Sequence, residues 1–260
     1  MNPLQLHIHK FNDRLLQVLS IDDISSVSWQ QLPLIIEINY QDFDGQEEKL
    51  LSDLSEHEKL RSFTYQKRTD ALRFVTGRAF LRKIISRITG INAAEIVIGK
   101  GENQKPILQY PQVPLNFNVS HAKNKVILAF DRHPIGIDIE NSENALKTPL
   151  FGHKALSVTE QKTLITEGNY RENFCLFWTR KEAFLKAIGK GIDDDIVNIP
   201  SIEGRYKVWG LNTEQNSDWS VMSFHTEEGY ICSLACNDEG NRASEMTYLK
   251  VGPAFDWSVN

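Results

Sequence analysis

The sequence lacks long apolar runs and lacks an excess of positive charge. No stretch approaches the roughly 18 consecutive apolar residues that a membrane-spanning helix needs, and the polar first residues do not resemble a signal peptide. Acidic residues number 34 against 29 Lys and Arg, which gives a formal net charge of −5. We therefore expect a cytoplasmic protein that binds neither membranes nor nucleic acid, because nucleic-acid binding needs a basic surface.

Cysteine is also scarce. The three cysteines, Cys175, Cys232 and Cys236, are an odd number in a chain of 260 residues, which suits a reducing compartment better than a disulfide framework. Cys232 and Cys236 are four positions apart, but no second pair or histidine cluster in the sequence completes a zinc site. The composition, 41% hydrophobic and 24% charged, is that of a globular protein with one large domain or two ordinary ones.

After about 32 residues of weak periodicity, the chain reads as two similar copies. Residues 34–39 and 135–140 both alternate apolar with other residues, as β-strands do. Glu37 and Asp138 occupy equivalent positions in these two strands, 101 residues apart.

A helix is predicted after the strand in each copy. A Ser-x-x-Glu capping box at Ser55 and another at Ser157 mark helix starts, and a long amphipathic pattern follows each. Both patterns contain Ala-Phe-Leu and then a basic residue, at 79–82 and 183–186. The repeated order favours an α+β fold of two similar lobes in a pseudo-twofold arrangement, with the active site in the cleft between them.

This organisation predicts four segments along the chain. They are an N-terminal extension (1–32), an N-terminal lobe (33–132), a C-terminal lobe (133–240) and a C-terminal tail (241–260).

Two carboxylates share one face of the second predicted strand. Side chains alternate along a strand, so Gly136, Asp138 and Glu140 point the same way, and the two acids lie roughly 7 Å apart at their backbones. Gly136 is expected to leave space beside them. Like charges held this close repel unless they share a cation or a proton, and magnesium suits oxygen ligands. The alternative is a sheet face turned to solvent, where such acids need no ligand.

The second predicted helix adds a third carboxylate. Apolar residues occupy nearly every face of residues 171–188, so this helix should be mostly buried, and charged residues within it need partners. Glu182 and Lys186 are four positions apart and could pair along the helix. Lys181 remains over, about 100° round the helix from Glu182. A site that binds both a cation and a phosphate would use all three.

Several side chains could hold an anionic ligand in the first copy: Arg73, Arg78, Arg82, Lys105, Ser120 and His121. Arginine binds phosphate bidentately, lysine binds it as a point charge, and Ser or His donates a hydrogen bond. Spacing alone does not choose among them, because each of these residue types is common on solvated surfaces.

Two acidic segments carry a family resemblance. Gly-Ile-Asp-Ile-Glu at 136–140 and Phe-Trp-Thr-Arg-Lys-Glu-Ala-Phe-Leu-Lys at 177–186 closely resemble the paired signature of the 4′-phosphopantetheinyl transferase superfamily. Asn-Val-Ser-His at 118–121 and Lys-Pro at 105–106 are similar to weaker segments of that family. The resemblance covers about residues 33–240 and has the two-lobed organisation of the Sfp-type members.

The resemblance implies a reaction of the holo-acyl-carrier-protein synthase type. A serine of an apo acyl or peptidyl carrier protein would receive the 4′-phosphopantetheine of coenzyme A, which is a substrate, with Mg²⁺ as cofactor. The implied metal ligands are three carboxylates: Asp138, Glu140 and Glu182. The implied residues for coenzyme A are Arg73, Arg78, Lys105, Ser120, His121, Lys181 and Lys186. Glu182 and Lys186 would be catalytic, with either Glu182 or a metal-bound water as the base.

Other functions also use clustered carboxylates. A magnesium-dependent phosphohydrolase or nuclease does so, although the acidic net charge argues against a nuclease. A duplicated scaffold could instead bind coenzyme A and a carrier protein without turnover. All three implied metal ligands are present as carboxylates, which favours an enzyme. A two-lobed chain with an internal cleft can work as a monomer, and no motif in the sequence identifies its carrier protein.

Overall fold

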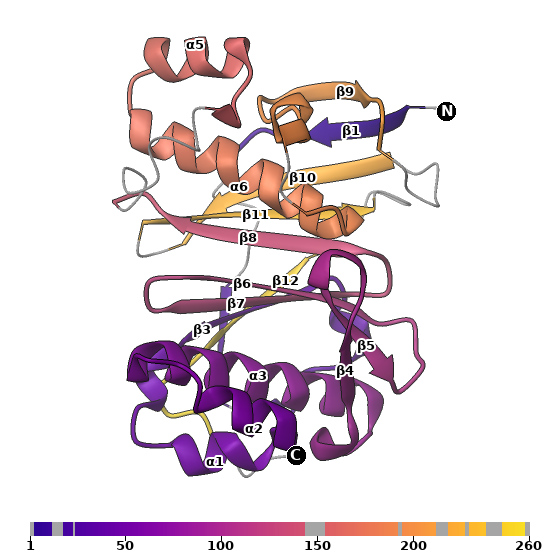
Figure 1. Cartoon of the computed structure of the whole chain (residues 1–260), viewed down its shortest axis with the longest axis vertical. Helices are drawn as coiled ribbons and strands as arrows, with labels where there is room; N and C mark the ends of the chain where they lie inside the picture. Colours follow the sequence, from indigo (N-terminus) through magenta and orange to yellow (C-terminus); the bar gives the residue numbers. More distant parts are fainter. Residues whose placement is uncertain are drawn as a thin grey trace. The chain divides into compact units, whose positions relative to one another are not determined.

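The computed structural model of the chain describes residues 3–11, 18–22, 24–143, 154–191, 194–211, 218–226, 229–237 and 246–257 (Figure 1). The strands are β1 (Leu4–Ile8), β2 (Val18–Ile21), β3 (Leu34–Asn39), β4 (Val97–Lys100), β5 (Pro106–Tyr110), β6 (Asn116–Ala122), β7 (Lys125–Asp131), β8 (Ile135–Asn141), β9 (Gly204–Val208), β10 (Asp218–His225), β11 (Tyr230–Asn237) and β12 (Thr247–Val251). The α-helices are α1 (Glu47–Ser52), α2 (Glu56–Ser62), α3 (Arg68–Thr89), α5 (Val158–Thr166) and α6 (Tyr170–Ile188). Within the described chain, no helix has the length and apolarity to span a bilayer.

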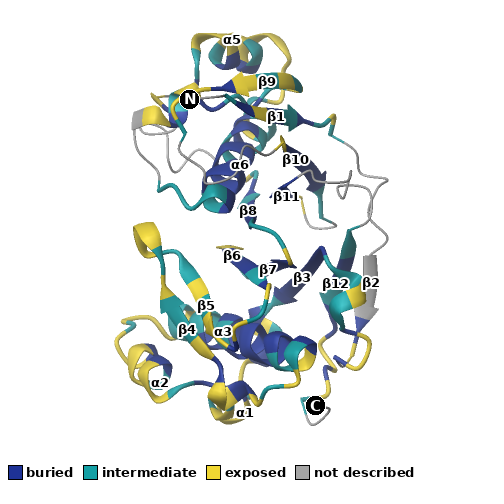
Figure 2. Cartoon of the chain, turned by 90° about the vertical axis from the view of Figure 1, so that its right-hand side faces the viewer, coloured by how far each residue is buried: buried dark blue, intermediate teal, exposed yellow. Residues whose placement is uncertain are grey.

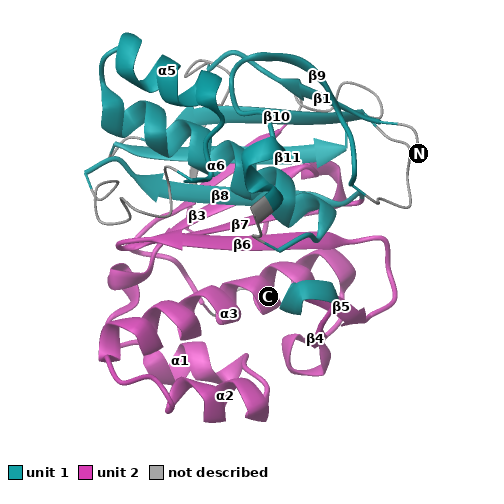
Figure 3. Cartoon of the chain, turned by 45° about the horizontal axis from the view of Figure 1, so that its top comes forward, with its two compact units in different colours: residues 1–15, 102–105, 133–245 teal, residues 16–101, 106–132, 246–260 magenta. Residues whose placement is uncertain are grey.

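The chain divides into two compact units: unit 1 with residues 1–15, 102–105 and 133–245, and unit 2 with residues 16–101, 106–132 and 246–260 (Figure 3). Each unit combines a five-stranded sheet with a long helix, which confirms the predicted α+β class. The pseudo-twofold arrangement and the cleft between the lobes stay predictions.

In unit 1, α6 lies across a sheet with the strand order β8-β11-β10-β1-β9 (Figure 1). Alternation along β1 directs Leu4, Leu6 and Ile8 to one face of the sheet, where they join Phe184 and Trp219 in a buried core. Almost every face of α6 is buried from Phe174 onwards, as predicted (Figure 2). The sheet and the helix therefore hold the charged residues of α6 inside the unit.

In unit 2, α3 packs on a sheet with the order β2-β12-β3-β7-β6, and β4 and β5 form a separate two-stranded sheet. Leu34, Ile36 and Ile38 of β3 share a core with Phe80 and Ile84 of α3. Figure 2 shows α3 largely buried, whereas α1 and α2 carry many exposed positions.

The two units repeat a pair of strands, which supports the predicted duplication. β3 pairs antiparallel with β7, placing Glu37 opposite Ile127. β8 pairs antiparallel with β11, placing Asp138 opposite Ser233. The equivalent carboxylates thus lie on equivalent strands, each beside a strand that follows a long helix in the sequence.

The capping boxes are present, but they begin short helices. Ser55 caps α2 and Ser157 caps α5, and in each unit the long helix starts separately afterwards. After α5 the backbone turns through Gly168 and Asn169, both with positive φ (72° and 34°), a conformation that a helix cannot continue.

The predicted extension and tail are not separate segments. β1, inside the predicted extension, lies between β10 and β9 in the sheet of unit 1, whereas β2 pairs with β12 in unit 2. β12, inside the predicted tail, lies between β2 and β3. These strands are four or five residues long and pair with partners that are far away in the sequence, so their local patterns are weak. Residues 241–245 and 258–260 of the predicted tail lie outside the described part.

Candidate active site

A close contact between β8 and α6 organises the acidic site of unit 1. A Cβ atom on Gly136 would lie 2.1 Å from the carbonyl oxygen of Ala183 and 2.3 Å from the amide nitrogen of Ala187. The helix backbone therefore fills the space that the sequence predicted to be open beside the carboxylates. Because alternate residues of a strand share a face, Asp138 and Glu140 are directed towards the same helix as Gly136.

Lys186 of α6 connects these carboxylates. Its Nζ lies 2.6 Å from Oδ1 of Asp138 and 3.9 Å from Oε2 of Glu182. The Lys186 side chain is 29% exposed, whereas those of Asp138 and Glu182 are 6% and 9% exposed. Glu140 interacts electrostatically with all three of them. The structure thus brings together the three carboxylates and the lysine that the sequence singled out.

Burial and mutual repulsion shift the protonation of this cluster. Burial, helped by the charge of Asp138, raises the pKa of Glu140 and that of Glu182 each to about 7. Burial alone would lower the pKa of Lys186, but the charges of Asp138 and Glu182 raise it above its ordinary value. Three carboxylates around one ammonium leave an excess of negative charge, which a divalent cation would relieve.

The side chains of this cluster are not arranged as a set of metal ligands. Among the described residues, no group of three or more His, Cys, Asp or Glu is close enough to hold a metal ion. The ammonium of Lys186 is the positive charge that contacts Asp138 and Glu182. The donor set, three largely buried carboxylates, is nevertheless the chemistry that Mg²⁺ prefers.

Lys181 lies apart from this cluster. Its side chain is 0% exposed, and its Nζ lies 2.9 Å from Glu160. It also donates to the carbonyl oxygens of Ala155 and Ile196. Glu160 in turn caps α5 through the amide of Ser157. Lys181 therefore ties α6 to the start of α5 inside the core of unit 1, and no donor is left for a phosphate.

The side chain of Lys105, which precedes β5 in the sequence, contacts the C-terminal end of α6 in unit 1. Its amino group donates to the carbonyl oxygens of Lys186 and Ala187, and burial lowers its pKa to about 8. The structure thus gives this side chain a partner that the sequence did not predict.

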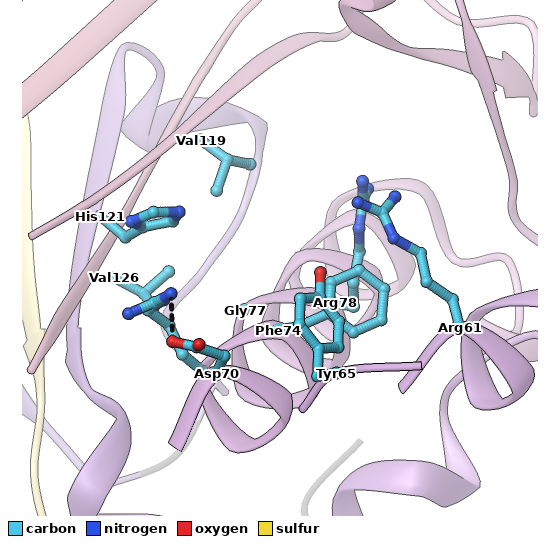
Figure 4. A pocket seen from close by; sticks show the side chains of 10 residues that line it. Arg61, Tyr65, Asp70, Phe74, Gly77, Arg78, Val119, His121 and Val126 are labelled. Carbon is cyan, nitrogen blue, oxygen red and sulfur yellow. Dashed lines mark hydrogen bonds and ion pairs between the residues drawn. The ribbon is translucent and has the colours of Figure 1, made fainter. Parts of the chain in front are cut away.

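Unit 2 contains a pocket of about 270 Å³ beside α3. Three residues predicted to bind coenzyme A line it: Arg73, Arg78 and His121. Figure 4 shows Arg61 and Arg78 close to the ring of Phe74, with Val119 and His121 on the opposite side. Arg61 and Arg78 lie 4.8 and 5.8 Å from the centre of that ring. Arg73 forms an ion pair with Asp70 at 2.8 Å.

The pocket has an excess of positive charge, because three arginines and one aspartate line it. The ion pair of Arg78 with Glu58 is long, with 3.8 Å between Nε and Oε1. Nη1 of Arg78 is buried without a hydrogen bond within the described residues. Burial and the neighbouring charges of Arg61 and Arg82 lower the pKa of Arg78. A buried donor without an acceptor is costly, so an anion in this pocket would be stabilised.

Two predicted residues lie elsewhere in unit 2. Ser120 precedes His121 on β6 and therefore points to the opposite face of that strand, away from the face that lines the pocket. Arg82 is 2% exposed, and it bonds to Glu58 and to the carbonyl oxygens of Ala93 and Ile96. Arg82 is consequently part of the core.

Among the lining residues that the sequence missed are Arg61, Tyr65 and Phe74. Arg61 is near the end of α2, where a lone basic residue resembles any solvated helix residue. Tyr65 precedes α3, and only packing against Phe74, at 5.3 Å between ring centres, brings it to the pocket. No signal in the spacing identifies them.

We predict that Gly136→Ala strongly destabilises unit 1. The added methyl group would overlap backbone atoms of α6, so the helix has to move away from β8 and carry Lys186 with it. Overpacking of this kind costs about 1–3 kcal/mol or more, and thermal unfolding measures it. Gly191→Ala is the matched control, because its nearest contact would be an ordinary 3.6 Å from Asn103. Equal stability of the two variants would contradict the close approach.

Comparisons with known proteins show the family of the chain. Two family models match consecutive parts of the chain: "4′-phosphopantetheinyl transferase, N-terminal" at residues 41–133 and "4′-phosphopantetheinyl transferase superfamily" at residues 134–235.

Individual relatives carry the same name. The chain is 32% identical over 188 residues to 4′-phosphopantetheinyl transferase gsp of Aneurinibacillus migulanus, covering 71% of this chain and 76% of that protein. It is 31% identical over 148 residues to 4′-phosphopantetheinyl transferase Sfp of Bacillus subtilis, covering 56% and 64%. It is 28% identical over 212 residues to pptA of Paxillus involutus, covering 72% and 80%. By these matches, the chain belongs to the 4′-phosphopantetheinyl transferase superfamily as an Sfp-type member.

Proposed function

We propose that this chain transfers the 4′-phosphopantetheine of coenzyme A to a serine of an apo acyl or peptidyl carrier protein. The observation that carries the proposal is the meeting of Asp138, Glu140 and Glu182 with Lys186, in a chain that belongs to this family. We further propose that it acts in the cytoplasm as a monomer. We also propose that the reaction is of the holo-acyl-carrier-protein synthase type.

We propose that the pocket of unit 2 binds the phosphorylated nucleotide of coenzyme A. Arg61, Arg73 and Arg78 line it, and the buried Nη1 of Arg78 needs an acceptor. A phosphate offers several acceptor oxygens, and the aromatic rings of Tyr65 and Phe74 offer an apolar surface to a base.

In unit 1, we propose that Asp138, Glu140 and Glu182 hold Mg²⁺. A bound magnesium ion would supply charge stabilisation to the pyrophosphate of coenzyme A. Burial, together with the charge of Asp138, raises the pKa of Glu140 and of Glu182, so a cation bound between these carboxyls would stabilise their charged forms, which supports the assignment. Lys186, which contacts both Asp138 and Glu182, would place its ammonium against the same phosphates.

In the proposed reaction, the hydroxyl oxygen of the carrier serine forms a bond to the β-phosphorus of coenzyme A. The bond from that phosphorus to the bridging oxygen breaks, and 3′,5′-adenosine bisphosphate leaves. The serine proton passes to a base, for which we propose Glu182, whose carboxylate lies 3.9 Å from the ammonium of Lys186 at the proposed phosphate site. Lys186 would stabilise the negative charge that gathers on the leaving oxygen.

The test is intact-mass spectrometry of apo carrier proteins incubated with the chain, coenzyme A and magnesium. The expected result is a gain of one phosphopantetheine mass that is lost when EDTA is added. No gain across fatty-acid, polyketide and peptide-synthase carriers would favour a binding module without turnover. Hydrolysis of coenzyme A without transfer would indicate a phosphohydrolase.

We predict that Arg61→Met raises the KM for coenzyme A about tenfold or more, since hydrogen bonds to a charged group contribute roughly 1.5–3 kcal/mol, and leaves kcat little changed. Steady-state transfer kinetics measure both constants. Arg87→Met is the control. Arg87 is an arginine of α3 that bonds to the carbonyl oxygen of Ser25 and does not line this pocket. An unchanged KM in Arg61→Met would remove this arginine from the nucleotide site.

A further inference from the structure

The segment of residues 102–105 is a tight turn that belongs to unit 1, although it connects β4 and β5 of unit 2 (Figure 3). The amide of Lys105 bonds to the carbonyl oxygen of Glu102, which closes the turn. Asn103 and Gln104 have positive φ values of 50° and 61°, a conformation that most residues avoid. This strained backbone directs the side chains of Asn103 and Lys105 to the same target, the end of α6.

The target is the group of carbonyl oxygens at the end of α6, where a helix lacks some of its regular hydrogen bonds. The oxygen of Lys186 also accepts from the amide of Gly189 at 3.4 Å. Lys105 donates to the oxygens of Lys186 and Ala187, the latter at 3.2 Å. The amide nitrogen of the Asn103 side chain donates to the oxygen of Gly189 at 2.8 Å. Gly189 ends α6 in the left-handed conformation, with φ 74°. Three carbonyls of one helix end are therefore bonded by a turn that is more than 80 residues away in the sequence.

The same helix end holds the charged site. The backbone oxygen of Lys186 bonds to Lys105, while the ammonium of Lys186 lies 2.6 Å from Asp138. A positive charge also interacts favourably with the negative end of a helix, and the partial burial of Lys105 reduces screening of that interaction. If the last turn of α6 frays, Lys186 loses its fixed position.

We propose that Lys105, with Asn103, is a positioning residue for Lys186 and acts by capping the end of α6. The proposal rests on the proposed transferase function and differs from the role that the family resemblance implied for Lys105, which was direct contact with coenzyme A. A positioning residue affects the chemical step, whereas a residue that contacts the nucleotide affects binding.

The experiment compares Lys105→Met, Lys105→Arg and Asn103→Gly in the full chain. Asn103→Gly removes only the side-chain bond, because glycine tolerates the positive φ. We expect Lys105→Met to lower kcat about tenfold or more, since small misplacements near a reaction centre have effects of this size, with little change in the KM for coenzyme A. Lys105→Arg, which retains charge and donors, should recover most of the loss, and Asn103→Gly should show a smaller loss of the same kind. Gln104→Asn is the control in the same turn, because Gln104 makes no side-chain bond to α6 in the described structure and asparagine tolerates its φ.

Hydrogen–deuterium exchange supplies a measurement that needs no turnover. Exchange in residues 183–190 should be faster in Lys105→Met than in the unchanged chain, with the first half of α6 unaffected. Unchanged exchange would overturn the proposal, and so would faster exchange with an unchanged kcat. A raised KM with an unchanged kcat would return Lys105 to the nucleotide site. If the unchanged chain modifies no carrier, the proposed function fails, whereas the exchange result still decides whether Lys105 caps α6.

Discussion

Asp138→Asn should reduce transfer to a carrier protein by about 100-fold or more, because it removes one of three proposed metal ligands and the partner of Lys186. The fold should persist, since Asn keeps the shape of the side chain and one fewer buried negative charge remains beside Glu140 and Glu182. Intact-mass spectrometry measures the transfer, and thermal unfolding without magnesium measures the fold.

Asp195→Asn is the matched control for this result. Asp195 is also a carboxylate of unit 1 that pairs with a lysine, Lys190 at 2.9 Å, but its side chain is 66% exposed. Transfer by Asp195→Asn should stay close to that of the unchanged chain. Full transfer by Asp138→Asn at limiting magnesium would contradict the metal assignment.

Lys181→Met should cause a large loss of stability, on the order of 3–5 kcal/mol, because breaking a buried ion pair leaves an uncompensated charge. That charge is on Glu160, whose side chain is 3% exposed and which lies 2.9 Å from Lys181. Denaturant or thermal unfolding of the chain measures the loss. Adding Glu160→Gln to Lys181→Met should restore part of the stability, since the remaining group is then neutral.

Lys186→Met distinguishes the role of Lys186 from that of Lys181, the other lysine of α6. The Lys186 side chain is 29% exposed and contacts Asp138 and Glu182, so its replacement should abolish most transfer. The loss of stability should be smaller than for Lys181→Met, because Lys181 is fully buried. The opposite pattern, a stable Lys181→Met with a raised KM for coenzyme A, would support the original assignment of Lys181 to the substrate.

The two equivalent carboxylates, Glu37 and Asp138, have different charged neighbours in the two units. In unit 2, Glu37 is paired with Lys125 at 2.9 Å and accepts a hydrogen bond from Tyr248, and all three side chains are buried. In unit 1, Asp138 is joined by Glu140 and Glu182 around a single lysine. The charge of Glu37 is balanced by its own lysine, whereas unit 1 retains the negative charge that a cation would neutralise.

Local patterns were sufficient for the parts of the site that lie on one strand and one helix. Alternation along residues 135–140 placed Asp138 and Glu140 on one face, because side chains of a strand alternate whatever its neighbours are. The i, i+4 spacing related Glu182 to Lys186 in the same way. These relations depend only on the backbone geometry of each element, and the structure agrees with both.

The sequence by itself determined the α+β class, the repeated strands and caps, and the acidic segments that mark the family. Only the tertiary structure decided which basic residues serve the core and which line a pocket. Lys181 and Lys186 are five positions apart on one helix, yet one faces Glu160 and the other faces Asp138. Arg61 joined the pocket and Lys105 reached the end of α6 through contacts between segments distant in the chain. Such contacts arise from packing and burial, which the periodicity of a single segment does not record.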